Sequence, residues 1–233
     1  MSEPDEPRAV AARYARRADL DRYRADRPEV RQMLSEREQA LGRLFSVQGW
    51  HTLEDKRVLE VGCGSGGNLQ RLLEMGFRAE HLAGIELLPE RFQAARAALP
   101  AQVQLFEGDA CGVDWPPLSV DAVLVATVFS SLLDQTFQQR LAETLWRWVK
   151  PGGGVIWYDF TVDNPRNPDV RGVPLSRLRE LFPEGLVRHE KVTLAPPIAR
   201  LVCRWHPRLY GAFNACPMLR THVLAWVGKP AAN

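Results

Sequence analysis

The chain has 233 residues, of which 45% are hydrophobic and 25% charged, and its formal net charge is +2. This length predicts one α/β domain with additions, and the small charge predicts no strong attraction to nucleic acid or to an anionic membrane. No run of about 20 apolar residues is present, the start MSEPDEPRAV is unlike a secretory signal, and four scattered cysteines without a CxxC pair favour a reduced, cytoplasmic protein.

The first 50 residues are rich in arginine, and their apolar side chains recur at helical spacing between Val30 and Phe45. This pattern predicts an N-terminal helical lid over 1–50, ahead of a main domain over 51–233. Acidic residues interleave with the arginines of 8–31, which predicts a solvated helix face there.

Short apolar segments then alternate with helical ones. Strands are predicted at 56–61, 82–86, 103–106, 120–126 and 155–158. Helices are predicted at 69–75, 89–99 and 137–149. This βαβ alternation is typical of a parallel, doubly wound sheet.

The last third of the chain completes the sheet. A helix is predicted at 175–182, and the last two strands at 186–194 and 221–227. The segment between these strands, 195–220, is too long for a tight hairpin and is predicted to form a helical cap over the sheet.

A glycine cluster joins the first strand to the helix after it, in the run Glu60-Val61-Gly62-Cys63-Gly64-Ser65-Gly66-Gly67. Glycines let the backbone turn sharply and approach a ligand, and the N–H groups of a helix start attract negative charge. The run also satisfies GxGxxG, with Glu86 about 20 residues further on, where a ribose-binding acid belongs. Alone, it therefore also fits an NAD(P)-dependent oxidoreductase.

Three further features favour another reading of the loop. Glu60 stands two residues before the first glycine, Gly108-Asp109-Ala110 follows the third strand, and Lys150-Pro151-Gly152-Gly153 precedes the fifth. Over about residues 56–160 this combination resembles the class I S-adenosylmethionine (SAM)-dependent methyltransferase family. The expected fold is a Rossmann-like, doubly wound α/β sheet of seven strands, mostly parallel, with the last strand antiparallel.

The resemblance implies SAM as cofactor and S-adenosylhomocysteine as product. It implies that Glu60 and the loop glycines hold the methionine end, that Glu86 accepts both ribose hydroxyls, and that Asp109 holds the adenine amino group. The residues predicted to bind the cofactor are Tyr14, Arg17, Glu60, Gly62, Cys63, Gly64, Gly66, Glu86, Leu87, Asp109, Ala110 and Thr127.

Later segments resemble a bacterial subgroup associated with natural-product and cell-surface glycan gene sets. They are 158–160, 164–168, 194–197 and 219–222. Ligands of an open parallel sheet bind at the carboxyl ends of its strands, which selects the acceptor-binding candidates. These are Phe129, Ser130, Tyr158, Asn164, Arg166, Arg200 and Arg220.

A hydroxyl acceptor loses its proton on methylation, so a nearby base helps. Asp159, at the end of a strand, and His222 are the candidates, although Asp159 could equally order a loop and His222 could be structural. A metal-assisted variant needs clustered carboxylates, and the end of the fourth strand offers Ala126-Thr127 and no acid. No metal is predicted.

The predicted function is methyl transfer from SAM to a small-molecule acceptor, such as a hydroxyl of a natural product or sugar. The alternative is a SAM-binding regulatory or partner protein without transfer activity. An oxidoreductase is disfavoured because none of the four tyrosines is followed by lysine four residues later. No zinc module or strong basic excess points to a nucleic-acid partner, and a monomer or homodimer is expected.

Overall fold

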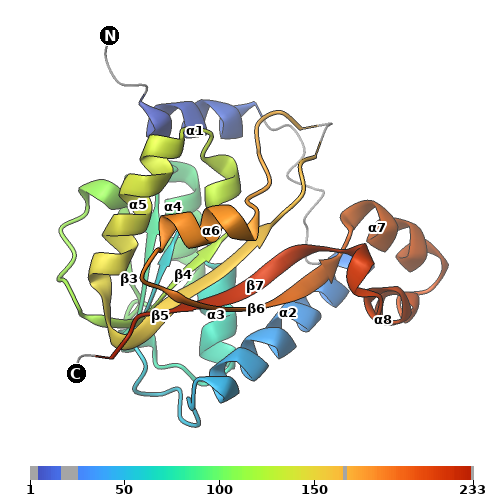
Figure 1. The fold of residues 1–233 in the computed structure, drawn as a ribbon, viewed down its shortest axis with the longest axis horizontal. Helices are drawn as coiled ribbons and strands as arrows, with labels where there is room; N and C mark the ends of the chain where they lie inside the picture. Colours follow the sequence, from blue (N-terminus) through green and yellow to red (C-terminus); the bar gives the residue numbers. More distant parts are fainter. Residues whose placement is uncertain (1–4, 17–25, 165–166, 232–233) are drawn as a thin grey trace.

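The computed structural model describes residues 5–16, 26–164 and 167–231. These form a seven-stranded sheet in the order β3-β2-β1-β4-β5-β7-β6 (Figure 1). The strands are β1 (Val58–Val61), β2 (Leu82–Glu86), β3 (Gln104–Glu107), β4 (Val120–Ala126), β5 (Val149–Phe160), β6 (Leu186–Leu194) and β7 (Arg220–Gly228). All run in one direction except β7, which is antiparallel to both neighbours. The predicted Rossmann-like sheet is confirmed.

Helices cover both faces of this sheet. The α-helices are α1 (Glu6–Ala15), α2 (Pro28–Val47), α3 (Gly67–Glu74), α4 (Pro89–Ala98), α5 (Gln135–Trp148), α6 (Leu175–Leu181), α7 (Pro196–Trp205) and α8 (Leu209–Asn214). Short 3-10 turns are η2 (Ala79–His81), η3 (Ala110–Gly112), η4 (Phe129–Ser131) and η5 (Pro217–Leu219). One hydrophobic core lies between the sheet and α5 and α6, and the other between the sheet and α2, α3 and α4.

Local sequence explains most of these boundaries. The central strand β1 is buried along its whole length, as expected for a parallel strand covered on both faces. Asp134 caps α5 by accepting hydrogen bonds from the backbone N–H groups of Thr136 and Phe137. Proline stands in the first turn of α1, α2, α4 and α7, where its missing N–H costs nothing.

The fifth strand is longer than predicted. It starts at Val149, which pairs with Val120, and the register then shifts before Gly154 pairs with Ala122. In the sequence the residues from Lys150 to Gly153 stand before the predicted strand at 155–158, yet in the structure they lie within β5 at this irregularity. A bulge of this kind lets a glycine-rich segment bend while the strand pairing continues.

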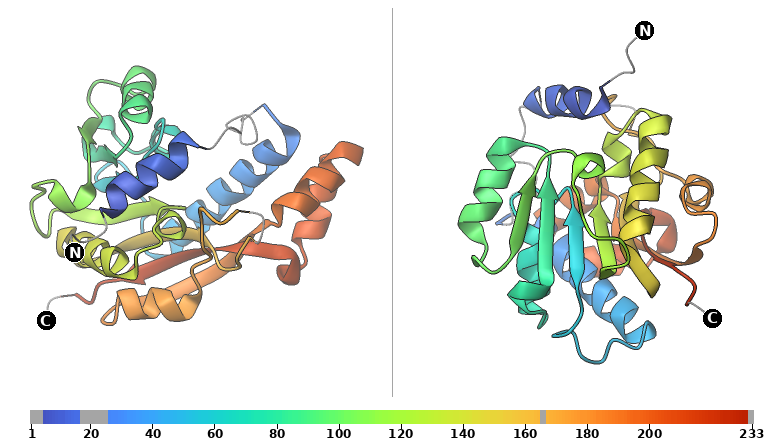
Figure 2. Two further views of the ribbon diagram at one scale, coloured as in Figure 1. Left: turned by 90° about the horizontal axis from the view of Figure 1, so that it is seen from above. Right: turned by 90° about the vertical axis from the view of Figure 1, so that its left-hand side faces the viewer.

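The N-terminal helices have different places. Helix α1 crosses the carboxyl ends of the parallel strands, whereas α2 lies on one face of the sheet (Figures 1 and 2). Ala40, Leu41 and Phe45 of α2 belong to the core on that face. Only α1 of the predicted lid therefore covers the strand ends, while α2 packs on a face of the sheet. The domain boundary at residue 50 stays a prediction.

The predicted helical insertion between the last two strands is present as α7, α8 and η5, but it projects beyond the ends of β6 and β7, so the prediction that it covers the sheet is wrong (Figures 1 and 2). Its own small core contains Leu194, Ala199, Val202, Cys203 and Tyr210. Tyr210 also ties the insertion to α2, because its hydroxyl donates a 2.7 Å hydrogen bond to Oε2 of Glu36. Within the described part of the chain, no helix combines the length and apolar content needed to cross a bilayer.

Candidate cofactor and acceptor site

The glycine loop after β1 has a backbone that side chains would disturb. Gly62, Gly64 and Gly66 all have positive φ angles, of 71°, 57° and 85°. A Cβ atom on Gly62 would lie 2.7 Å from Cγ2 of Val128, and one on Gly66 would lie 2.7 Å from Cδ1 of Leu99. Glycine is the residue that adopts this conformation at no steric cost, so the loop can bring bare backbone against a ligand.

Glu86 joins this loop to the end of β2. Its Oε2 accepts a 2.7 Å hydrogen bond from the backbone N–H of Gly64, and its Oε1 accepts one of 2.8 Å from Leu88. The side chain lines the pocket at the strand ends. Each carboxylate oxygen can accept more than one hydrogen bond, so both remain able to accept from a ligand hydroxyl.

Glu60 supplies a second, deeper carboxylate. It is completely buried, and its Oε1 accepts a 2.5 Å hydrogen bond from Nδ2 of Asn68. Asn68 in turn accepts a 2.5 Å hydrogen bond from Nη2 of Arg37 on α2. Burial raises the pKa of Glu60 to about 7. Its Oε2 has no hydrogen-bond partner among the described residues, and such orphaned buried atoms are rare unless a ligand or water completes them.

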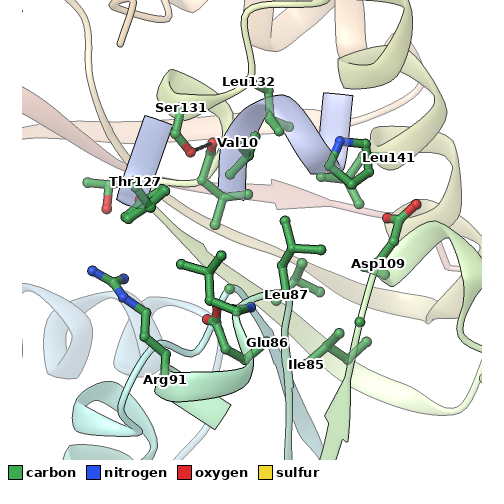
Figure 3. Close-up of a pocket in the computed structure, with 18 of the residues that line it drawn as sticks. Val10, Ile85, Glu86, Leu87, Arg91, Asp109, Thr127, Ser131, Leu132 and Leu141 are labelled. Atoms are coloured by element: carbon green, nitrogen blue, oxygen red, sulfur yellow. Dashed lines mark hydrogen bonds between the residues drawn. The ribbon is translucent and has the colours of Figure 1, made fainter. Parts of the chain in front are cut away.

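The pocket itself lies between α1 and the carboxyl ends of the strands. Figure 3 shows Val10 of α1 across from Glu86 and Leu87, with Asp109 at the side. Seven of the predicted cofactor-binding residues line it: Tyr14, Gly62, Glu86, Leu87, Asp109, Ala110 and Thr127. Arg91 also lines it and was not predicted; its guanidinium carbon lies 4.6 Å from the ring centroid of Tyr14.

Four other predicted cofactor residues lie in or beneath the glycine loop. Cys63 is 4% exposed, and burial raises its pKa, so it is an unreactive packing residue of the loop. Glu60, Gly64 and Gly66 also lie in or beneath the loop, outside the lining of the pocket. Arg17 lies outside the described residues.

Two of the lining residues owe their position to local backbone geometry. Thr127 has a φ of 56°, a strained conformation for a β-branched residue, and its N–H donates a 2.7 Å hydrogen bond to the carbonyl oxygen of Tyr158. Asp109 caps η3, because its Oδ1 accepts a 2.9 Å hydrogen bond from the N–H of Cys111. Strain at a ligand-facing position is typical of functional sites.

A buried ion pair anchors α1 over the pocket. Nη2 of Arg13 lies 2.5 Å from Oε1 of Glu6 and donates a 2.9 Å hydrogen bond to the carbonyl oxygen of Ser131. The same Glu6 oxygen accepts a 2.7 Å hydrogen bond from the N–H of Leu133. The prediction of a solvated arginine face is wrong for Arg13, which is 8% exposed. Its spacing of seven from Glu6 places both on one helix face, a signal that could have found the pair.

The acceptor-binding candidates are mostly packed in the interior. Phe129 and Tyr158 are 1% and 3% exposed. The Phe129 ring lies 4.5 Å from that of Trp157, and the Tyr158 hydroxyl lies 2.9 Å from Oγ1 of Thr193. Arg220 donates hydrogen bonds to the carbonyl oxygens of Asn214 and Lys191, which ties β7 to the helical insertion and to β6.

The remaining candidates lie apart from these. Asn164 is exposed on the loop after β5, and Arg200 is half-buried on α7. Arg166 lies outside the described residues. Their predicted roles in binding an acceptor stay predictions.

The two candidate bases have defined contacts. Asp159 is 2% exposed; its Oδ2 accepts a 3.0 Å hydrogen bond from the N–H of Ser130 and its Oδ1 one of 2.9 Å from Phe160. Burial raises the pKa of Asp159 to about 7. The ring of His222 stacks on Tyr158 at 5.0 Å, and burial, followed by the charge of Arg37, lowers its pKa to about 4.

Neither side chain is among the lining residues of the pocket. The contacts of Asp159 order the turn at η4, and the catalytic role of both residues stays a prediction. Among the described residues there is no group of three or more His, Cys, Asp or Glu side chains that could hold a metal ion.

The fold and the glycine loop define a Rossmann-like nucleotide-binding domain. Residues 58–153 match the model of a family described as a methyltransferase domain. A demethylmenaquinone methyltransferase of Deinococcus radiodurans is 34% identical over 108 residues, 45% of this chain and 43% of that protein. A fatty-acid O-methyltransferase of Mycolicibacterium smegmatis is 35% identical over 122 residues, 49% of this chain and 43% of that protein.

Solved structures share the fold. A SAM-dependent methyltransferase from Archaeoglobus fulgidus superposes with a TM-score of 0.59 at 15% identity, covering 83% of this chain and 94% of that one. Phosphoethanolamine N-methyltransferase 2 of Haemonchus contortus, solved with SAM, gives 0.57 at 18% identity, covering 83% and 52%.

Residues 58–153 therefore match a methyltransferase domain family, and the fold is that of SAM-dependent methyltransferases, whose cofactor is SAM. The residues of the site fit this cofactor for two reasons. Oε2 of buried Glu60 has no hydrogen-bond donor among the described residues, and the glycine loop lets the backbone approach a ligand closely. The chain spans less than half the length of the first two curated relatives described above.

Proposed function

We propose that this protein transfers the methyl group of SAM to an oxygen of a small-molecule acceptor, such as a hydroxyl of a natural product or a sugar. The observation that carries the proposal is the pair of buried acids, Glu60 and Glu86, on the two sides of the glycine turn. One acid lines the pocket and the other keeps an oxygen without a partner among the described residues. A cytoplasmic location belongs to the same proposal.

In this proposal the protein binds SAM, orients it toward the acceptor, and excludes water. When bound, SAM supplies a methyl group already activated by its sulfonium. Glu86 would accept the ribose hydroxyls, Asp109 would hold the adenine, and Glu60 would face the cationic methionine end. Helix α1, held by its buried ion pair, would keep water from the reacting groups, since alignment and dryness are what such a transfer requires of an enzyme.

A hydroxyl acceptor also has to give up its proton. Of the two predicted bases, Asp159 is the better match, because its pKa of about 7 lies near neutral pH, whereas that of His222 is about 4. The hydrogen bonds from Ser130 and Phe160 give Asp159 a competing structural role. An acceptor that is already an anion, such as a carboxylate, would need no base.

A SAM-binding partner protein without transfer activity is the second candidate. It is favoured by the burial of Phe129, Ser130 and Tyr158, which leaves these predicted acceptor contacts inside the core. It shares the glycine loop and Glu86 with the enzyme, so cofactor binding alone does not separate the two.

The deciding experiment follows a labelled methyl group. The purified protein is incubated with [methyl-³H]SAM and panels of sugars, phenolic natural products, fatty acids and quinols. The last two classes are chosen because the similar proteins are named for acting on a fatty acid and a menaquinone precursor. Label in one acceptor class, lost in a Glu86→Gln variant, supports the enzyme. Tight SAM binding without transfer to any acceptor supports the partner protein.

A further inference from the structure

The helical insertion at 195–220 presents large apolar side chains to solvent. Their exposed fractions are 58% for Leu201, 82% for Trp205, 37% for Leu209, 41% for Phe213 and 89% for Met218. Single exposed apolar residues are ordinary, but a group gathered on two short helices and the adjoining turn marks an interaction surface.

These side chains occupy one side of each helix. Leu201 and Trp205 are four residues apart on α7, as are Leu209 and Phe213 on α8, so each pair lies on one helix face. The opposite side of α7 packs inward through Val202 and Cys203. Both helices project from the body of the molecule beyond the ends of β6 and β7 (Figures 1 and 2). We call Leu201, Trp205, Leu209, Phe213 and Met218 the apolar tip.

The segment that carries the apolar tip is basic. Residues 195–220 contain four arginines and neither aspartate nor glutamate, although the whole chain carries a formal charge of only +2. Arg204 and Arg208 are exposed and directly precede Trp205 and Leu209 in the sequence. Arg220 points back to the carbonyl oxygens of Asn214 and Lys191 instead.

We propose that the apolar tip, with Arg204 and Arg208, docks this protein on the surface of an anionic lipid bilayer. Tryptophan, leucine, phenylalanine and methionine gain free energy when they are buried at the boundary between headgroups and acyl chains. Exposed arginines beside them pair with lipid phosphates and are attracted by a negative surface potential. The interaction is peripheral, because α7 and α8 have 10 and 6 residues and are too short to span a bilayer.

Charge also disfavours a second copy of the chain as the occupant. A symmetric dimer would bring the same surface of two molecules together, and residues 195–220 supply four arginines and no acid to pair with them. An anionic bilayer supplies both the apolar layer and the opposite charge. The inference does not rest on the proposed function, since lipid binding is measured without any methyl transfer.

The test is sedimentation of the full chain with lipid vesicles. Vesicles of phosphatidylcholine alone are compared with vesicles that contain equal parts of phosphatidylcholine and phosphatidylglycerol. We expect the protein to sediment with the anionic vesicles, to bind the neutral ones more weakly, and to be released by salt, because screening weakens the arginine–phosphate attraction. Failure to bind the anionic vesicles at low salt overturns the proposal.

Variants assign the binding to this surface. Trp205→Ser with Met218→Ser, and separately Arg204→Gln with Arg208→Gln, should each lower the affinity for anionic vesicles about tenfold. The matched controls are Leu186→Ser, at an apolar side chain that is 67% exposed on β6, and Arg96→Gln with Arg179→Gln, at exposed arginines on α4 and α6. The controls should bind as the parent does.

Two further outcomes contradict the proposal. Equal vesicle binding by the parent and by both double variants, of Trp205 with Met218 and of Arg204 with Arg208, would place the lipid contact elsewhere. The surface would instead be a dimer interface if the parent self-associates in gel filtration, if the two double variants do not, and if no vesicle binding is seen. Circular dichroism checks that each variant is folded, and the arginine pair carries the test if the Trp205→Ser variant is not.

Discussion

The guanidinium carbon of Arg91 on α4 lies over the ring of Tyr14 on α1, 4.6 Å from its centroid, and both side chains line the pocket at the strand ends. At the other side of the pocket, Arg13 and Glu6 fasten the same helix to the carbonyl oxygen of Ser131 and the N–H of Leu133. Together with the ion pair of Arg16 and Asp169, these contacts hold helix α1 across the strand ends. The cation–π contact is weaker than the buried ion pair of Arg13 and Glu6.

The weaker contact should govern how long the cofactor stays. We expect Tyr14→Ala to raise the dissociation rate of SAM about threefold to tenfold, because an exposed cation–π contact contributes about 0.5–1 kcal/mol and the ring also covers the pocket. Stopped-flow fluorescence or competition with labelled cofactor measures this rate. Tyr14→Phe is the control and should keep most of the effect of the ring; an unchanged rate in Tyr14→Ala would remove Tyr14 from the cofactor set.

The buried ion pair should govern whether α1 docks at all. Glu6→Gln leaves the buried guanidinium of Arg13 without its counter-charge, and breaking one partner of a buried pair costs about 3–5 kcal/mol. We expect α1 to detach while the sheet stays folded, which gives faster proteolysis and amide exchange over 6–15 with little change in the melting temperature. Asp5→Asn is the control, because the ion pair of Asp5 with Arg8 is on the surface. Equal protection of α1 in both variants would contradict this role.

The strands, helices and site residues that could be predicted are those that a short stretch of sequence determines. Strands and helices alternate with clear periodicity, and the glycine loop, Glu86 and Asp109 follow strand ends at fixed positions. Such residues come together because parallel strands place their carboxyl ends on one edge of the sheet. The pocket lining therefore contains seven of the predicted cofactor residues.

The remainder depends on contacts between residues far apart in sequence. Arg13 meets Ser131, 118 positions away, and Arg37 reaches Asn68 beneath the loop, 31 positions away. Neither of these two pairings leaves a local pattern. For Arg13 the only local signal of burial is its spacing of seven from Glu6. The overall charge of +2 likewise hides the acid-free arginine cluster of the helical insertion, because acids elsewhere balance it.

Glu86 offers a direct test of the cofactor site. In Glu86→Gln an amide NH₂ replaces an oxygen that accepts a backbone hydrogen bond, from Gly64 or from Leu88, and one ribose acceptor is lost. We expect the dissociation constant for SAM to rise at least about tenfold, since an unsatisfied buried polar group costs about 1–3 kcal/mol. Calorimetry measures the constant, with Glu90→Gln, an exposed acid on α4, as the control. An affinity equal to that of the control would count against the whole assignment.

Asp159 can be tested for its two competing roles. In Asp159→Asn the amide NH₂ faces either the N–H of Ser130 or that of Phe160, so we expect a loss of about 1–3 kcal/mol in unfolding free energy. If the residue only orders the turn, turnover per folded molecule stays near that of the parent and its pH profile is unchanged. If it is the base, turnover falls strongly and the pH dependence near 7 disappears. Denaturant unfolding and initial rates, measured on the same samples, separate the two.

The pH dependence of cofactor binding should report on Glu60. Burial raises its pKa from 4.5 to about 7, so the ligand-free fold favours the protonated form. The protonated Glu60 therefore contributes to the free energy of unfolding, fully below pH 4.5 and less and less as the pH rises through about 7.

A cationic methionine end selects the ionised form of Glu60, so SAM affinity should increase from about pH 5.5 to about pH 7.5. In Glu60→Gln the affinity should be lower and nearly independent of pH over this range. Calorimetry across the range gives the slope, and a slope as steep in Glu60→Gln as in the parent would assign the titration to another group, for which Asp159, with its similar pKa, is the first to examine.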